Sequence, residues 1–164
     1  MSSLPPWRKQ ARNLLARPLR EQILIAQTFV LLGASRLAIR ALTFRRLERF
    51  LGERMVESPE ELSPAQIQAA RTVRWAIGRV SGRTPWVSDC FPQAIAARVL
   101  LRRRKVPCTI YLGAGFVSER AEGDNSASAA SLTTMVAHAW VRSGPLFVTG
   151  GDGTLKYGAV ASFS

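Results

Sequence analysis

Apolar residues recur at helical spacing through the first third of the chain and predict an N-terminal helical region. Residues 7 to about 52 read as helix, with Pro18 at a natural helix start. Leu42, Leu47, Phe50 and Leu51 continue the apolar face at Thr43 and beyond it. The positions that follow Pro18 at this spacing, and that we expect to form the apolar face, are Leu19, Ile23, Ala26, Val30, Gly33, Ala34, Leu37 and Ala41.

The most apolar stretch of this region runs from Gln22 to Ser35. Its 14 uncharged residues are too few to span a bilayer as a helix. Arginines flank the stretch on both sides, which would also suit a helix lying along a membrane surface. We expect a buried helix of a bundle, and peripheral membrane contact stays open.

Two further helices are predicted after a polar connector at residues 57–63. Ser63 and Gln66 form a capping box with a proline in the first turn, and Gly82 ends that helix. Its inner face is expected to hold Ile67, Ala70, Val73, Arg74, Ile77 and Val80. The next amphipathic helix starts at Cys90 and stops before Pro107, and Ser88 or Asp89 can cap its N-terminus.

The period of the pattern then changes from helix to strand. Residues 108–117 read as a strand, and residues 118–133 as a polar loop. Met135–Arg142 and Leu146–Thr149 look like consecutive strands joined by residues 143–145. Helices followed by an antiparallel sheet predict an α+β fold. We divide the chain into an N-terminal helical region, 1–58, and a core, 59–164.

Composition supports one domain with free thiols and a basic surface. The chain has 164 residues, two cysteines and no secretory signal pattern, so we expect a cytoplasmic protein without disulfides. Residues 1–54 carry 11 of the lysines and arginines against three acidic residues, and a second basic cluster runs from Arg98 to Lys105. A net charge of +12 can serve nucleic acid, anionic lipid or an acidic partner, or can be a solvated surface.

Cys90 and His138 are the residues best suited to chemistry. A thiol at a helix N-terminus meets the positive end of the helix dipole, which favours the thiolate, and backbone N–H groups that could hold an oxyanion. His138 is the single histidine, so any Cys–His chemistry must use it. Strand alternation places His138 and Trp140 on one face. A buried, inert cysteine and a core histidine are the alternatives.

Other candidates have weaker support. Asp152 lies one strand and one turn beyond His138, where a carboxylate could fix the imidazole tautomer, although Asp-Gly is also an ordinary turn. Asp124 and Asn125 are runners-up for that role. Cys108 has no special electrostatics and is expected to be structural. A zinc site of Cys90, Cys108 and His138 would lack a fourth ligand, and we expect no metal or cofactor.

The chain resembles the lasso-peptide leader peptidases, transglutaminase-like cysteine proteases of bacterial ribosomal-peptide maturation. The segments that carry the resemblance are Cys90-Phe91-Pro92-Gln93-Ala94, residues 100–107, the strand to Gly113, and Ala137-His138-Ala139-Trp140-Val141. The helical stretch from Arg36 to Leu47 is also similar to the family's N-terminal region. This layout, with a helix-opening cysteine followed by a strand histidine, implies a papain-like and transglutaminase-like core whose catalytic helix packs on an antiparallel sheet.

The resemblance implies an activity and partners. Cys90, His138 and Asp152 match the family's Cys–His–Asp triad, and the implied reaction is cleavage of a lasso-peptide precursor between leader and core. A separate leader-recognition protein would act in trans, and a separate ATP-dependent cyclase would close the macrolactam. Lys105 departs from the glycine frequent in the family, and the Asp152 region matches least well.

Two alternatives stay open at this point. The chain could be a basic helical binding module for nucleic acid or anionic membrane, with inert Cys90 and His138, although the peptidase interpretation expects no nucleic acid. It could also be a transglutaminase-like acyl transferase that passes the acyl group to an amine rather than to water.

Overall fold

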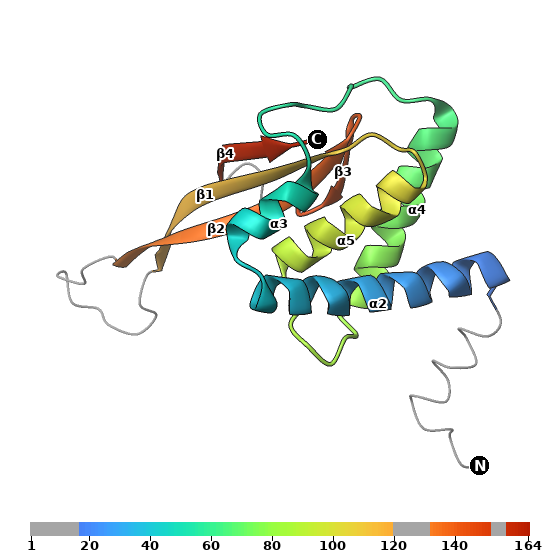
Figure 1. Ribbon diagram of the computed structural model, residues 1–164, viewed down its shortest axis with the longest axis horizontal. Helices are drawn as coiled ribbons and strands as arrows, with labels where there is room; N and C mark the ends of the chain where they lie inside the picture. Colours follow the sequence, from blue (N-terminus) through green and yellow to red (C-terminus); the bar gives the residue numbers. More distant parts are fainter. Residues whose placement is uncertain (1–16, 120–131, 152–156) are drawn as a thin grey trace, which may run out of the picture.

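The computed structural model describes residues 17–119, 132–151 and 157–164, and its helices precede an antiparallel sheet (Figure 1). The predicted α+β class is therefore confirmed. The helices and strands are α2 (Leu19–Ala41), α3 (Phe44–Leu51), α4 (Pro64–Ser81), α5 (Cys90–Arg103), β1 (Thr109–Glu119), β2 (Leu132–Ser143), β3 (Leu146–Thr149) and β4 (Gly158–Phe163).

The sheet has the strand order β3-β2-β1-β4, with antiparallel neighbours throughout. The β1–β2 pair is the longest ladder and extends past the helices as a twisted hairpin (Figure 1). β3 matches its predicted bounds. Residues 118–119 and 132–133 were expected in a loop but pair within β1 and β2, so the predicted loop was too long at both ends. The remainder of that loop lies outside the described residues.

The N-terminal helical stretch is broken at Leu42 and Thr43. Both residues have extended backbone, with ψ of 145° and 150°, and Thr43 begins α3 as its N-cap residue. The prediction of helix from residue 7 to about 52 therefore holds only in two pieces, and residues 7–16 lie outside the described part. In α3, Leu47 and Leu51 are buried, whereas Phe50, which was expected on the same apolar face, is 71% exposed.

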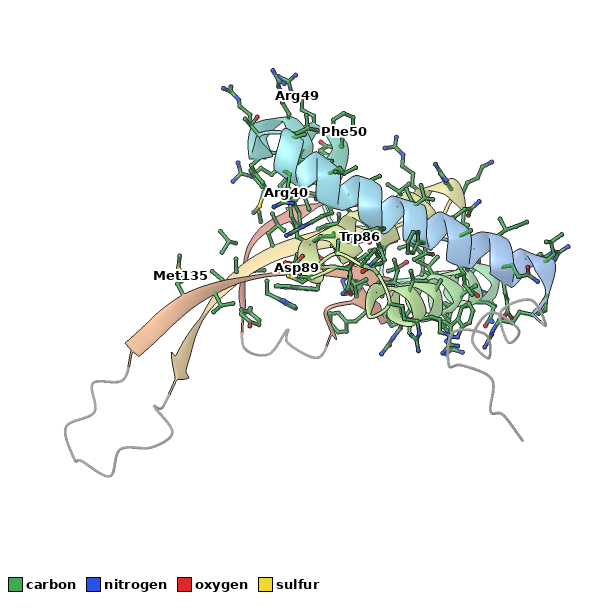
Figure 2. All side chains as sticks on the ribbon, turned by 90° about the horizontal axis from the view of Figure 1, so that it is seen from below. Arg40, Arg49, Phe50, Trp86, Asp89 and Met135 are labelled. Carbon is green, nitrogen blue, oxygen red and sulfur yellow. The ribbon has the colours of Figure 1, made fainter. Side chains whose placement is uncertain are left out.

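The buried face of α2 is not the predicted one. Leu24, Thr28, Leu32 and Ser35 are buried, whereas Val30 and Leu37 are 66% and 69% exposed. Successive residues turn by about 100°, so the expected stripe lies on the side of the helix opposite this buried set. The expectation of a helix buried through that stripe was wrong, because α4 and α5 cover only one side of α2. Figure 2 views the molecule from the α2 side.

Two contacts fit α2 to its neighbours, one on its buried face and one at the side of the helix. The buried hydroxyl of Thr28 donates to the carbonyl oxygen of Leu24 at 2.7 Å, so no polar group is left unpaired there. Gly33 lets the Trp86 ring approach, since a Cβ at that position would lie 3.0 Å from the ring. Phe29 packs on the same ring at a centroid distance of 4.9 Å.

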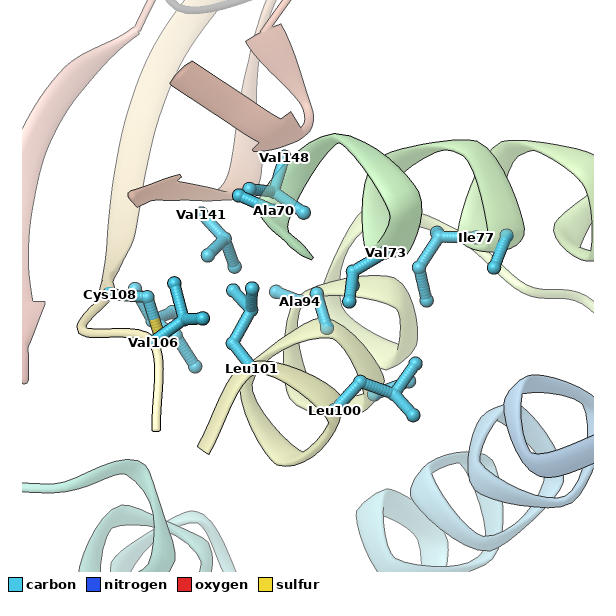
Figure 3. Packing of buried hydrophobic residues seen from close by; sticks show 14 of the residues in the cluster. Ala70, Val73, Ile77, Ala94, Leu100, Leu101, Val106, Cys108, Val141 and Val148 are labelled. Atoms are coloured by element: carbon cyan, nitrogen blue, oxygen red, sulfur yellow. The ribbon is translucent and has the colours of Figure 1, made fainter. Parts of the chain in front are cut away.

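Helix α4 follows its predicted pattern closely. The Gln66 N–H donates to the Ser63 hydroxyl, the Ser63 N–H donates to the Gln66 side chain, and the helix ends at Gly82. Four of its predicted inner residues, Ala70, Val73, Ile77 and Val80, are buried and pack against α5 and the sheet (Figure 3). Ile67 is only half-buried, and Arg74 is exposed because a charged side chain stays in water. The side chains of this core that Figure 3 labels are Ala70, Val73, Ile77, Ala94, Leu100, Leu101, Val106, Cys108, Val141 and Val148.

Helix α5 lies between α2 and the sheet and is buried along most of its length. It begins at Cys90, as predicted, but neither expected side-chain cap forms. Asp89 occupies the N-cap position and makes no capping hydrogen bond, while the Ser88 hydroxyl bonds to Thr84 at 2.9 Å. The first turn of α5 therefore keeps its backbone N–H groups clear of side-chain caps. The proposed division between residues 58 and 59 stays a prediction.

Candidate active site

The start of α5 forms one wall of an apolar pocket of about 270 Å³. Cys90 is half-buried at this wall, and Phe91 and Phe44 are neighbours at a ring centroid distance of 6.5 Å. Elements that lie far apart in the sequence thus meet at one thiol. The lining residues come from α3, α5, β1 and β2: Phe44, Cys90, Phe91, Leu112, Gly113, Ala137, His138 and Ala139.

The backbone at the start of α5 can stabilise negative charge. The first bond of the helix joins the Gln93 N–H to the Asp89 carbonyl at 3.3 Å. The N–H groups of Cys90 and Phe91 precede it and have no acceptor within the helix, and Pro92 carries no N–H. The two N–H groups lie beside the thiol at the positive end of the helix dipole, which favours an oxyanion or a thiolate there.

His138 is held on β2 by a series of aromatic rings. Its imidazole stacks on Tyr157 at 4.8 Å between centroids and on Trp140 at 5.9 Å, and Trp140 stacks in turn on Tyr111 at 5.5 Å. The prediction that His138 and Trp140 share a face is confirmed. Gly113 lies opposite His138 in the register and leaves room for Trp140, since a Cβ there would meet that ring at 2.7 Å.

The carbonyl oxygen of Gly150 determines the tautomer of His138. It lies 3.0 Å from Nε2. A carbonyl oxygen only accepts hydrogen bonds, so Nε2 must carry the proton, and the lone pair of the neutral ring is on Nδ1. Nδ1 is therefore the ring atom able to take a proton from a thiol.

Gly150 was missed as a functional residue by the sequence reasoning. Its φ of +68° and its surroundings both require glycine, because a Cβ would lie 2.7 Å from the Ala139 carbonyl oxygen and 3.0 Å from Nε2 of His138. The signal available in the sequence was the Gly150–Gly151 pair directly after a strand. By itself, such a pair predicts only a turn.

The structure brings Cys90 and His138 to one pocket, but the two side chains do not hydrogen-bond. Ala139 packs in the core, and alternation along β2 puts the imidazole on the other face, with Trp140. β3 pairs with β2 only at Val141, Arg142 and Ser143. At His138, which comes earlier in β2, this edge of the strand has no strand partner among the described residues. The imidazole thus lies beside an open strand edge.

Three predicted residues cannot be placed. Asp152, Asp124 and Asn125 all lie outside the described residues. Gly150, two positions before Asp152, is the residue that the structure shows at Nε2 of His138. The third triad position therefore stays a prediction.

Cys108 differs from Cys90 in its surroundings. It is buried at 6% exposure, as expected for a structural cysteine. Burial raises the pKa of the Cys108 thiol, and the nearby Arg98 guanidinium offsets part of that rise. Within the described ranges no group of three or more His, Cys, Asp and Glu side chains could hold a metal ion, so Cys90, Cys108 and His138 are not assembled as a zinc site.

The second basic cluster is not uniformly a surface feature. Arg98 is buried and donates to the carbonyl oxygens of Cys108 and Phe163 at 3.5 and 3.4 Å, which ties α5 to β1 and β4. Burial lowers the pKa of Arg98. A hollow of about 490 Å³ beside it is also lined by Arg102 and Lys105, and it contains no histidine. The pocket at Cys90 is therefore the better candidate for acyl chemistry.

Comparison with protein families identifies the superfamily to which the chain belongs. The family model of the transglutaminase-like superfamily matches residues 33–162, and the chain belongs to that superfamily. The superfamily includes cysteine proteases and acyltransferases, and its activities typically depend on a cysteine. Comparisons with curated proteins and with solved structures give no match.

Proposed function

We propose that this chain is a cysteine endopeptidase that removes the leader from a lasso-peptide precursor. The observation that carries the proposal is the pocket at the first residue of α5, which is lined both by Cys90 and by the stretch of β2 that bears the chain's single histidine. Membership of the transglutaminase-like superfamily supports cysteine-based acyl chemistry. The Cys90 and Ala-His-Ala-Trp segments support the narrower assignment through their resemblance to leader peptidases.

The first half-reaction follows from the groups at the pocket. Nδ1 of His138 takes the Cys90 proton, and the thiolate attacks the carbonyl carbon of the last leader residue. The oxyanion of the tetrahedral intermediate is held by the Cys90 and Phe91 N–H groups. When the C–N bond breaks, the imidazolium returns its proton to the leaving nitrogen. The core peptide leaves with a free amino terminus, and the leader remains as a thioester on Cys90.

The second half-reaction restores the enzyme. His138 takes a proton from water, the hydroxide attacks the thioester carbonyl, and the thiol leaves with its proton restored by the imidazolium. In both halves the imidazole must face Sγ, so we propose that the ring turns toward Cys90 around the open edge of β2. In this orientation Nε2 faces the segment that follows β3, which contains Gly150 and Asp152. The Asp152 carboxylate then orients the imidazole.

The proposed partners follow from the same assignment. A separate recognition protein presents the leader, and an ATP-dependent cyclase uses the freed amino terminus. The working compartment in this proposal is the cytoplasm. The substrate segment beside the scissile bond would enter an apolar pocket, since Phe44, Phe91 and Leu112 form its walls.

The decisive experiment compares cysteine and histidine variants on one precursor. The wild type, Cys90→Ala and His138→Ala are incubated with a candidate precursor peptide encoded near this chain's gene, with and without the recognition protein. Cys108→Ala is the matched control, because it removes the buried sulfur distant from the proposed chemistry. We expect cleavage by the wild type and by Cys108→Ala alone. Cleavage by folded Cys90→Ala would overturn the proposal.

Acyl transfer is the second candidate, because the superfamily contains acyltransferases. The same thioester would then react with an amine instead of water. Mass spectrometry distinguishes the two, since hydrolysis yields a leader with a carboxyl terminus and transfer yields an amide. Thioester formation at Cys90 without a hydrolysed leader would favour transfer.

A further inference from the structure

The outer face of α2 is an apolar stripe on a basic surface, and within residues 17–119, 132–151 and 157–164 nothing covers it. Four of its aliphatic side chains are 48% to 69% exposed, namely Leu19, Ile23, Val30 and Leu37. They follow one another by four or seven residues, so they form one straight line along the helix. Aliphatic residues scattered singly over a surface are normal, whereas such a continuous line marks an interaction surface.

The buried residues of α2 show that the helix cannot leave the fold without a loss of stability. By length and composition α2 could cross a membrane, but Leu24 and Leu32 are 3% and 0% exposed against α4 and α5. Crossing would remove these side chains from the core. Only the line of exposed aliphatic side chains remains available to a partner. Such a line suits a helix that lies along a surface rather than one that crosses a bilayer.

Charge around the stripe favours an anionic partner. Residues 17–51 contain seven arginines and two glutamates. Glu21 is paired with Arg17 at 2.8 Å, so it adds little free negative charge. Arg20 is exposed near the start of the stripe, and Arg40 and Arg49 are exposed near its end, where Figure 2 shows them on α2 and the adjoining α3.

The same charges disfavour a second copy of the chain. Parallel pairing of two α2 helices would oppose Arg20 to Arg20 and Arg40 to Arg40. Antiparallel pairing would oppose Arg20 to Arg40 at both ends. Like charges meet in either arrangement, and Glu21 is the only acidic residue on the helix to offset them.

We propose that the outer face of α2 binds the surface of an anionic membrane, with the helix in the plane of the interface. The aliphatic line enters the boundary between headgroups and acyl chains, while the flanking arginines extend to lipid phosphates. The proposal is independent of the peptidase assignment, since it uses none of the residues at the Cys90 pocket. It identifies a location for the protein rather than a reaction.

The test is cosedimentation of the full chain with lipid vesicles. Vesicles of phosphatidylcholine with about 30% phosphatidylglycerol are compared with pure phosphatidylcholine, at low and high salt. We expect at least tenfold stronger partitioning onto the anionic vesicles, weakened by salt. Val30→Glu and Leu37→Glu should each lower that partitioning at least tenfold.

Two control variants separate this surface from the general charge of the protein. Val160 on β4 is 69% exposed, close to the 66% of Val30, so Val160→Glu makes the same change away from α2. It should alter partitioning by less than twofold. Arg40→Gln with Arg49→Gln should weaken binding more than Arg71→Gln with Arg74→Gln on the exposed side of α4. Circular dichroism confirms that each variant is folded.

Three outcomes would overturn the proposal. The first is equal binding of the wild type to neutral and anionic vesicles, and the second is unchanged binding by Val30→Glu. The third is a dimer, seen by sedimentation velocity, that Val30→Glu dissociates while vesicle binding is unaffected. This last result would assign the stripe to a second copy of the chain.

Discussion

The carbonyl oxygen of Gly150 lies 3.0 Å from Nε2 of His138 and leaves Nδ1 as the basic atom of the chain's single imidazole. This contact depends on the positive φ of Gly150, which lets the backbone approach the ring without a Cβ between them. A backbone group thus holds the ring nitrogen at which a carboxylate is expected in a Cys–His–Asp triad. The relationship leads to a test of both stability and catalysis.

Gly150→Ala should reduce stability and activity together. The new Cβ would meet Ala139 and His138 in a left-handed backbone, and we expect a loss of about 1–3 kcal/mol in the free energy of unfolding. Gly78→Ala is the matched control, because no atom lies within 4 Å of a Cβ at that position of α4. It should raise stability by about 0.5–1 kcal/mol. Chemical denaturation measures the free energy of unfolding of both variants. A Gly150→Ala protein as stable as the wild type would refute the geometry.

Asp152→Asn tests the third triad position directly. If the carboxylate stabilises the imidazolium, the amide should lower kcat by about 10²–10⁴-fold with a smaller effect on KM. Asp124→Asn should leave cleavage unchanged. Wild-type rates from Asp152→Asn would show that the Gly150 carbonyl is sufficient to orient His138.

The two cysteines should react differently with an alkylating agent. Cys90 is half-buried at a pocket, whereas Cys108 is buried and its pKa is raised by that burial. Iodoacetamide at about pH 8 should therefore modify the folded chain at Cys90 alone, because the thiolate is the reactive form. Peptide mapping identifies the modified residue. Equal labelling of Cys108 in folded protein would contradict its burial.

The raised pKa of Cys108 also predicts how stability changes with pH. Above the ordinary thiol pKa the unfolded chain releases this proton, while the folded chain still holds it. The contribution of Cys108 to the free energy of unfolding therefore falls as pH rises from the ordinary thiol pKa toward the raised pKa of the folded chain. Cys108→Ala should remove this part of the alkaline dependence, and denaturation at several pH values measures it. An unchanged slope in the variant would contradict the assignment to Cys108.

Leu32→Ala and Leu37→Ala compare the two faces of α2. Leu32 is 0% exposed and joins α2 to the core, so its truncation should cost about 2–5 kcal/mol. Leu37 is 69% exposed, and its truncation should stay within about 0.5 kcal/mol. Similar losses in the two variants would show that the outer face is covered within the protein itself.

Much of the local structure could be predicted from the sequence because its causes are local. The capping box at Ser63 and Gln66 begins α4 within one turn of chain, and the start of α5 at Cys90 follows from the change in pattern after the preceding loop. Alternation along β2 placed His138 with Trp140 on one face. These features depend on residues a few positions apart, and the α+β order follows from their sequence.

The tertiary structure decided what depends on distant partners. Helical periodicity indicated the stripe from Leu19 to Ala41 as the apolar face of α2, whereas the packing of α4 and α5 buries Leu24, Thr28 and Leu32 on the opposite side. The group that holds Nε2 of His138 depends on where β3 ends and how Gly150 turns. The amino-acid pattern therefore determined most of the elements, but not β4 or the break before α3, and it determined the candidate nucleophile and base. Their surroundings were set by contacts between segments far apart in the chain, which no local period encodes.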